Sequence, residues 1–323
     1  MMDGEAASPF HEGELALQAR AGMQEKIARY GQRAIRPFMP EEHREFFEEL
    51  PFLFVASLDD SGRPWASMVW GIPGFASALE PAILQIAGTL ARGDPLSRNL
   101  SPGAPVGVLG IQLETRRRNR ENGVVVARQG DAFSLRVTQS FGNCQKYIQA
   151  RRAKFRRDPR VQPDTPAIEE GARLSDEARR IVSTSDTCFI ASSSAQPASG
   201  ERGQGVDVSH RGGLPGFARL NEAGAASVIT LPDYIGNFLF NTLGNIEQDR
   251  HVGLLFVDFA RGSLLTLTGE ASIIWDGPEV HSTLGAQRLV RVSVSHGLRM
   301  DEVLPFTWSD PDFAPQFREA RRS

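Results

Sequence analysis

The alternation of hydrophobic and polar positions predicts two series of short β-strands, each preceded by a helix. The first helix is expected at 40–50, where Pro40 occupies the first turn and acidic residues follow it. The second is expected at 175–182, with Ser175 as the N-cap. Turns that contain glycine or proline separate the strands. The strands are expected at 52–57, 64–70, 82–87 and 106–113 in the first series, and at 188–193, 206–210, 226–231, 252–259 and 263–275 in the second.

The two series are similar in sequence, which indicates an internal repeat. Residues 65–75 align with 207–217 at a shift of 142, and both segments hold Ser, Gly, Pro, Gly and Phe at matching places. A second match, between 106–113 and 252–259, has a shift of 146. A third match, between Phe54-Val-Ala-Ser57 and Phe189-Ile-Ala-Ser192, has a shift of 135. The three matches occur in the same order in both copies, and their shifts differ only by loop-sized insertions. We interpret the chain as a tandem duplication.

About six short strands and one helix per copy fit a small barrel better than a doubly wound sheet. The fold class is therefore predicted to be mainly β, with two tandem barrels and flanking helices. The basic run 151–157 is interpreted as a solvated helix end. The expected parts are an N-terminal helical arm at 1–38, a first barrel at 39–155, a linker at 156–174, a second barrel at 175–290 and a C-terminal tail at 291–323.

Composition agrees with a folded chain of about two domains. The 323 residues are 41% hydrophobic and 23% charged, which excludes disorder over most of the length. The formal charge of −3 argues against a strongly cationic protein that binds nucleic acid or a membrane surface. The acidic start lacks the features of a signal peptide, and the uncharged stretch 64–79 is shorter than the ~20 residues that span a bilayer. We expect a cytoplasmic protein.

Several common catalytic and metal-binding motifs are missing from the sequence. The two cysteines, Cys144 and Cys188, and the six histidines have no metal-ligand spacing, so no metal site is predicted. The thiols are interpreted as small buried hydrophobic groups. The sequence also lacks the glycine-rich motifs of Rossmann and P-loop proteins and the GxSxG elbow of α/β-hydrolases.

The first candidate for chemistry is the segment 207–217. On a strand, Asp207, Ser209 and Arg211 share one face because side chains alternate. A hydroxyl beside a guanidinium can hold a phosphate, since arginine binds two oxygens through its fork. The alternative is a solvated hairpin strand with a surface arginine.

The second candidate is the segment 231–246. A strand ends at Pro232, and a short helix is expected to begin near Gly236, where free N–H groups attract phosphate. Asn237, Asn241 and Asn245 recur every four residues and predict a stripe of amides on one helical face. The alternative is an ordinary capped helix with asparagine-rich ends.

The third candidate is the arginine-rich segment 114–123, which holds four arginines within five positions. Such a cluster is repulsive unless an anion or an acidic partner screens it. Asn122-Gly123 is typical of a tight turn. The segment is therefore either a solvated hairpin tip or a set of arginines that faces a ligand phosphate.

Motifs in both copies carry a family resemblance. The second copy holds DVSHRGGLPGF, LPDYIGNFLFNTLGNI and HVGLLFVDF, and the first holds PWASMVWGIPGF, VGVLGIQLETRRRNRENG and QSFGNCQKYI. Over roughly residues 40–290 the chain resembles the pyridoxamine 5'-phosphate oxidase-related flavoproteins, the FMN-binding split β-barrel family. The resemblance implies two tandem FMN-binding split barrels that pair about a twofold axis, with FMN across their interface.

The resemblance also implies which residues bind the cofactor. Ser209, His210 and Arg211 correspond to the strand that holds the flavin phosphate. The next group corresponds to the turn and helix that meet the phosphate, the ribityl chain and the ring: Pro232, Tyr234, Asn237 and Asn241. Arg116, Arg118 and Arg120 lie where the partner barrel contributes.

Two departures from the family pattern limit what is carried over. The first copy has Met68 and Val69 where the second has His210 and Arg211, so we expect the second barrel to hold one FMN and the first to serve as a wall. The second copy also lacks the basic run of true pyridoxamine oxidases. A vitamin B6 substrate is therefore not predicted.

The expected function is FMN-dependent oxidoreduction of an unidentified small substrate. The alternative is a non-enzymatic flavin-binding module that transfers electrons with a partner reductase. A haem or a deazaflavin is a third reading, with His210 or His251 as the haem ligand. Small-molecule substrates or redox partners are expected rather than nucleic acid or membranes, and a homodimer stays open.

Overall fold

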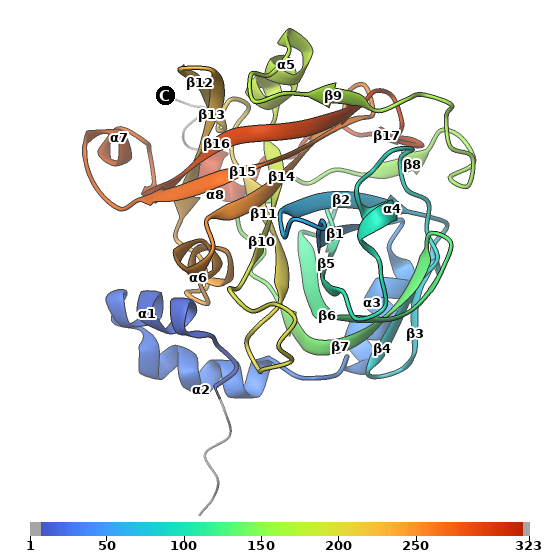
Figure 1. The fold of residues 1–323 in the computed structure, drawn as a ribbon, viewed down its shortest axis with the longest axis horizontal. Helices are drawn as coiled ribbons and strands as arrows, with labels where there is room; N and C mark the ends of the chain where they lie inside the picture. Colours follow the sequence, from blue (N-terminus) through green and yellow to red (C-terminus); the bar gives the residue numbers. More distant parts are fainter. Residues whose placement is uncertain (1–7, 319–323) are drawn as a thin grey trace, which may run out of the picture.

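Two antiparallel β-sheets with the same order of strands make up most of the computed structural model, which describes residues 8–318 (Figure 1). The first sheet has the order β2-β1-β5-β6-β7-β4-β3. Its strands are β1 Phe52–Leu58, β2 Pro64–Trp70, β3 Ala76–Glu80, β4 Ile83–Ile86, β5 Pro105–Gln112, β6 Arg117–Gln129 and β7 Ala132–Gly142. These elements lie at the lower right of Figure 1.

The second sheet has the order β11-β10-β14-β15-β16-β13-β12, and a short strand β9 (Ile168–Glu170) pairs with β16. Its strands are β10 Thr187–Ser193, β11 Val206–Gly212, β12 Arg219–Ala223, β13 Ala226–Tyr234, β14 His251–Asp258, β15 Ser263–Ile274 and β16 Ala286–Met300. The predicted fold class, mainly β with flanking helices, is confirmed. β16 runs across residue 290, where the tail was expected to begin.

The strand positions follow the repeat found in the sequence. β10 begins 135 residues after β1, β11 begins 142 residues after β2, and β14 begins 146 residues after β5. These are the shifts that relate the similar sequence segments. Each half of the chain therefore carries one copy of the same strand topology.

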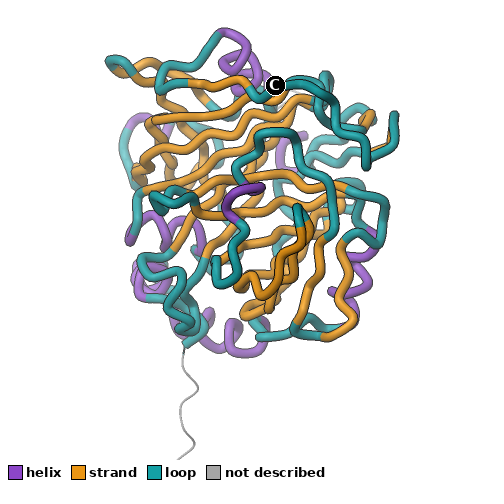
Figure 2. Tube along the Cα trace, turned by 45° about the vertical axis from the view of Figure 1, so that its right-hand side comes forward, coloured by secondary structure: helices purple, strands orange, loops and turns teal. Residues whose placement is uncertain are grey.

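The helices lie at the periphery of the sheets (Figure 2). In the N-terminal arm, α1 (Glu12–Arg20) packs against α6 (Asn241–Gln248), and α2 (Gln24–Ala34) follows it. The hydroxyl of Ser175 accepts a hydrogen bond from Ala178 N and caps α5, as predicted. The remaining helices are α3 Glu41–Glu49, α4 Leu96–Asn99, α5 Asp176–Thr184, α7 Pro278–His281 and α8 Pro315–Arg318. None of the helices within residues 8–318 combines the length and apolarity that a membrane crossing requires.

The halves meet through a hydrophobic core that contains β1, β2 and β5 side chains from one half and β10, β11 and β14 side chains from the other. Phe54 and Phe189, which occupy equivalent positions in the two copies, stack with their ring centroids 3.4 Å apart. Two residues related by the repeat can stack on each other only near the axis that relates the copies. A pseudo-twofold axis therefore passes close to this pair.

Two equivalent glycines allow the halves to approach each other backbone to backbone. A Cβ on Gly107 of β5 would lie 2.6 Å from the carbonyl oxygen of Val206, and a Cβ on Gly253 of β14 would lie 2.6 Å from that of Pro64. Val206 and Pro64 are themselves equivalent, because each begins the second strand of its copy. The same close contact is thus made twice, once on each side of the pseudo-twofold axis.

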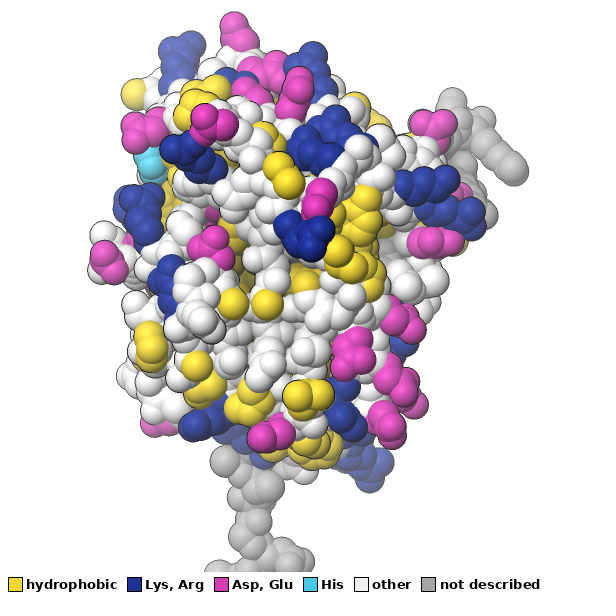
Figure 3. All heavy atoms as spheres, turned by 90° about the vertical axis from the view of Figure 1, so that its right-hand side faces the viewer, with side chains coloured by type: hydrophobic (Ala, Val, Ile, Leu, Met, Phe, Trp, Pro, Cys, Tyr) yellow, Lys and Arg dark blue, Asp and Glu magenta, His cyan; other side chains and the backbone are white. Residues whose placement is uncertain are grey.

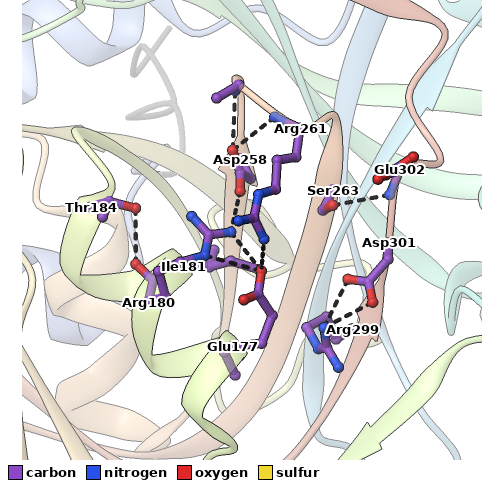
Figure 4. Close-up of polar contacts among 12 residues, drawn as sticks. Glu177, Arg180, Ile181, Thr184, Asp258, Arg261, Ser263, Arg299, Asp301 and Glu302 are labelled. Carbon is purple, nitrogen blue, oxygen red and sulfur yellow. Dashed lines mark hydrogen bonds and ion pairs between the residues drawn. The ribbon is translucent and has the colours of Figure 1, made fainter.

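Ion pairs fasten α5 to the turn between β14 and β15 (Figure 4). The Glu177 carboxylate accepts hydrogen bonds from Arg180 and Arg261 at 2.7 Å each. Arg180 also reaches the carboxylate of Asp258 at 2.5 Å. The apolar face of α5 is buried against the second sheet, so packing provides most of the stability of this helix and the ion pairs mainly fix its orientation.

On the surface drawn in Figure 3, basic and acidic side chains are interspersed.

The expected helix end at 151–157 is wrong, although most residues of this run are exposed as expected. Ala153–Phe155 forms a strand, β8, which pairs with β17 (Phe306–Trp308) from the C-terminal part of the chain. Arg151 is buried, and its guanidinium lies 2.5 Å from the Asp186 carboxylate. The arginines of this run have carboxylate or carbonyl partners from distant residues, and these partners hold an extended segment rather than a helix.

Candidate functional site

A pocket of about 950 Å³, with the open solvent at its mouth included, lies where the two halves meet. The second half contributes the end of β11 and the segment from β13 to α6, and the first half contributes β6 and the segment that follows β7. Nine of the ten residues that the sequence predicted to bind a cofactor line this pocket. They are Arg118, Arg120, Ser209, His210, Arg211, Pro232, Tyr234, Asn237 and Asn241.

Arg120 is the most buried cation of the pocket and links the two halves. Its guanidinium donates to the Ser209 hydroxyl at 2.7 Å and to the Asn241 side-chain oxygen at 3.0 Å. It also lies 2.8 Å from the Asp207 carboxylate, and the Asp207 and Arg120 residues are both buried. Side chains along β6 alternate between its two faces, so Arg118 also faces the pocket. Arg117 points to the other face and donates to the Glu42 carbonyl. The turn of the β5–β6 hairpin lies at 113–116, so the hairpin-tip alternative holds for the start of the segment. Asn122-Gly123 forms no turn, because it lies inside β6.

Cations outnumber carboxylates around the pocket. The Arg211 guanidinium donates to Asp233 at 2.7 Å, and Arg288 lies 3.4 Å from the other oxygen of the same carboxylate. Burial and the neighbouring Arg120 charge lower the pKa of Arg118, but a guanidinium keeps its proton at neutral pH. The cations are Arg118, Arg120, Lys146, Arg211 and Arg288, and the carboxylates are Asp207 and Asp233. A ligand with negative charge suits this excess.

His210 is buried, with only 5% of its surface exposed. Neither of its ring nitrogens has a hydrogen-bond partner among residues 8–318. Burial, then the charges of Arg118 and Arg211, hold the pKa of His210 well below its usual value, so the imidazole is neutral. A buried polar group without a partner is costly. Because His210 lines the pocket, a ligand is a natural source of the missing hydrogen bond.

Aromatic side chains also line the pocket, and we call them its aromatic side. The rings of Tyr147 and Tyr234 stack at 4.9 Å between centroids. Phe238 and Phe240, whose ring centroids are 6.1 Å apart, also line the pocket. Tyr147, Phe238 and Phe240 have positive φ values of 66°, 61° and 64°, a conformation that bulky residues rarely adopt. Strained residues of this kind gather at binding and catalytic sites. The backbone around this pocket is held in a shape that local preference alone would not give.

The predicted helix start and amide stripe need correction. α6 begins at Asn241 rather than near Gly236, because Phe240 takes the left-handed conformation. Asn237 lies in the preceding loop, where its side-chain oxygen accepts from Leu239 N. Asn245 is buried and donates to Ser192. Of these three asparagines, Asn237 and Asn241 therefore line the pocket and Asn245 does not.

Arg116 is the predicted residue that lies outside the pocket lining. Its guanidinium donates to the backbone oxygen of Ile148 at 3.0 Å, and to the backbone oxygen and carboxylate of Asp312 at 2.9 Å each. Arg116 thus contacts the C-terminal segment, whereas Arg118 and Arg120 contact the pocket.

Glu14 supports the site from the N-terminal arm and was not predicted. α1 and α6 approach closely, since a Cβ on Gly13 would lie 2.2 Å from the carbonyl oxygen of Gly244. This contact places the buried Glu14 carboxyl against Asn241, whose amide nitrogen donates to it at 2.5 Å. The Asn241 amide oxygen is therefore left to face Arg120. Nothing in the sequence near Glu14 marks it as a site residue.

Replacement of Glu14 by glutamine is expected to change how stability depends on pH. Burial raises the pKa of Glu14 to about 8, with Asn241 and His11 N opposing the shift. The folded chain thus keeps a proton that the unfolded chain releases above about pH 4.5, so stability falls between these two pH values. Relative to the wild type, Glu14→Gln should gain about 4 kcal/mol of stability between pH 5 and pH 9.

Urea unfolding of the ligand-free chain at several pH values tests this expectation. Glu25→Gln, at an exposed position on α2, is the control and should follow the wild type throughout. Parallel curves for Glu14→Gln and the wild type from pH 5 to 9 would show that the Glu14 carboxyl titrates normally.

The equivalent place in the first half is filled by side chains. Met68 and Trp70 of β2 are fully buried there together with Leu264, Met300 and Phe306. The Trp70 indole donates to the Pro159 carbonyl at 3.1 Å, so the linker also covers this position. The first copy therefore has hydrophobic core where the second copy has a cationic pocket.

No sequence family and no characterised protein sequence matches the chain. Solved structures with some similarity are HupZ of Group A Streptococcus (12% identity, TM-score 0.30, covering 41% of this chain and 97% of that chain) and HutZ, the heme storage protein from Vibrio cholerae (16%, 0.26, 41% and 97%). Another is a Lactobacillus delbrueckii protein assigned as a pyridoxamine 5'-phosphate oxidase (13%, 0.29, 42% and 97%). Each covers less than half of this chain. At these TM-scores the similarity carries no argument about function, so the site is interpreted from its own geometry.

Proposed function

We propose that the pocket between the two halves binds one FMN per chain. The observation that carries this proposal is the excess of cations over carboxylates around the pocket, together with the strained aromatic residues that line it. A dianionic phosphate suits the first and a planar ring suits the second.

The polar atoms of the pocket fit this cofactor. Arg120 Nε and both ring nitrogens of His210 are buried and have no hydrogen-bond partner within residues 8–318. Arg118, Arg120 and Arg211 would hold the phosphate. Asn237 and Asn241 present amides that both donate and accept, which suits the ribityl hydroxyls and the ring edge.

The bound flavin would supply hydride or electron transfer, so the chain itself needs no nucleophile. Its residues bind and orient the cofactor, and the buried arginines favour negative charge in the pocket. The Tyr147–Tyr234 pair shields one side from water. We therefore propose an FMN-dependent oxidoreductase that acts on a small molecule. The alternative is an electron-transfer module, which would bind the same flavin but exchange electrons with a partner reductase instead of acting on its own substrate.

Haem is a second candidate ligand, and one observation favours it. The His210 imidazole is neutral and buried, and its ring nitrogens have no hydrogen-bond partner within residues 8–318, so one of them is free to bind iron. The absorbance spectrum of the purified chain separates the two candidates, because a flavin and a haem absorb at different wavelengths.

Replacement of Arg211 by alanine is expected to weaken FMN binding about tenfold to a hundredfold, the effect of one charge-assisted hydrogen bond. Fluorescence titration of the ligand-free chain measures the dissociation constant and the number of sites. Arg179→Ala is the control, since Arg179 pairs with Glu222 outside the pocket. Unchanged affinity in Arg211→Ala would remove Arg211 from the phosphate site. Two FMN per chain, or none, would contradict the proposed function.

A further inference from the structure

The C-terminal segment 312–317 lies behind the aromatic side of the pocket. The Phe317 ring is 5.5 Å from the Tyr234 ring and 5.8 Å from the Tyr147 ring, measured between centroids. Both tyrosines line the pocket, whereas Phe317 does not. With 9% of its surface exposed, Phe317 packs against the outer side of the tyrosine pair.

Arg116 anchors this segment to the first half. It donates two hydrogen bonds to Asp312 and one to the Ile148 carbonyl, next to Tyr147. Ala150 and Asp312 exchange two backbone hydrogen bonds of 2.9 Å. The segment is therefore attached to the same loop that carries Tyr147.

Gln149 joins the segment to the pocket strand of the second half. Its side-chain oxygen accepts from Ala314 N at 2.8 Å, and its side-chain nitrogen donates to the Gly213 carbonyl at 2.8 Å. Gly213 directly follows β11, the strand that carries Ser209, His210 and Arg211. One buried side chain thus connects the C-terminal segment to both halves.

Tyr147 needs such support because its own conformation is strained. Its φ is 66°, and its hydroxyl donates to the Ile235 carbonyl at 3.0 Å across the pocket mouth. Strained residues persist only where surrounding contacts hold them. The contacts on the outer side of Tyr147 come from Phe317 and from the loop that Arg116 and Gln149 fasten.

We propose that the segment 312–317 completes the ligand site and controls access to it. While the segment is docked, Phe317 holds Tyr147 and Tyr234 together across the pocket mouth. When it detaches, Tyr147 loses this support, the mouth opens and a planar ligand can enter or leave. Arg116 and Phe317 are positioning residues in this scheme, and the identity of the ligand rests on the proposed function.

The segment is short, and it is held by hydrogen bonds and by the buried side chains of Phe313, Ala314 and Phe317. Near the end of a chain such a segment opens more often than the core does. Cys144 reports on such opening, because it is half-buried and lines the same pocket. Cys188 is fully buried, and burial raises the pKa of its thiol. A thiol reagent applied to the native, ligand-free chain should therefore modify Cys144 and leave Cys188 intact.

The first experiment measures the rate of Cys144 modification. Phe317→Ala and Arg116→Gln are each expected to raise it about threefold to tenfold, while Cys188 stays unmodified. Phe317→Leu and Arg116→Lys should restore part of the protection. Phe155→Ala removes an exposed ring of β8, and Arg92→Gln removes an exposed ion pair with Asp164. Both controls should match the wild type.

The second experiment measures FMN release by stopped-flow fluorescence. The same two variants should raise the dissociation rate more than they change affinity, because an open mouth speeds entry as well as release. Absence of FMN binding in the wild type would end the proposed function, but the thiol rates would still decide on the segment. Unchanged Cys144 rates in Phe317→Ala and Arg116→Gln would overturn the inference. Should Phe317→Ala fail to fold, Phe317→Leu decides in its place.

Discussion

Replacement of Arg120 by methionine is expected to lower FMN affinity at least about a hundredfold and to cost the ligand-free chain about 3–5 kcal/mol of stability. Arg120 donates to Ser209 and Asn241 and pairs with Asp207 at the junction of the halves. Its loss leaves Asp207, which is 3% exposed, as an uncompensated charge inside the protein. It also removes the most deeply placed cation available to a ligand phosphate.

The double variant Arg120→Met/Asp207→Asn separates the two effects. It removes the stranded charge, so most of the lost stability should return, while FMN affinity should stay low. Urea unfolding without flavin and fluorescence titration with FMN provide the two measurements. Arg117→Met is the matched control, since Arg117 lies on the same strand but faces away from the pocket. Full recovery of FMN binding in the double variant would show that Arg120 acts only through Asp207.

Replacement of Gly107 or Gly253 by alanine is expected to destabilise the chain by about 3 kcal/mol in each case. Each new Cβ would lie 2.6 Å from a carbonyl oxygen of the other half, which is backbone and cannot rotate away. The two sheets would have to separate locally, and the core between them would lose contacts. Similar losses at both positions are expected, because the pseudo-twofold axis makes their surroundings equivalent.

Chemical unfolding of the two variants and of Gly171→Ala checks this expectation. A Cβ on Gly171 would meet no atom within 4 Å, so this control should be close to neutral. The double variant Gly107→Ala/Gly253→Ala is expected to unfold at the lowest urea concentration. If Gly107→Ala and Gly253→Ala behaved like Gly171→Ala, the two sheets could not pack as closely as described.

Apolar strands that are bounded by glycine and proline turns could be predicted from the sequence. Each of the nine expected strands overlaps a strand of the structure. The strand β6 was missed for a physical reason. β6 begins Arg-Arg-Asn-Arg-Glu-Asn, which reads as a solvated loop, yet Arg120 and Glu121 are buried there against groups from distant parts of the chain. β16 is a different case. The alternation Leu-Val-Arg-Val-Ser-Val from 289 to 294 was a usable strand signal within the expected C-terminal tail.

The candidate site was predictable as far as its residues lie in unusual local patterns. Ser209 and Arg211 alternate on one strand, and Arg118 and Arg120 belong to a conspicuous basic run. Glu14 and Arg288 carry no such mark, because only the approach of α1 to α6 and of β16 to β13 brings them to the site. Phe317 likewise gains a role only through the docking of the C-terminal segment.

The pocket has walls from both halves of one polypeptide. In an assembly of two separate chains, such a site dissolves on dilution, and its occupancy depends on protein concentration. Covalent linkage keeps the two walls at a high effective concentration. Ligand affinity should therefore be the same at nanomolar and micromolar protein, and a cell that makes few copies of this chain would still have every site assembled.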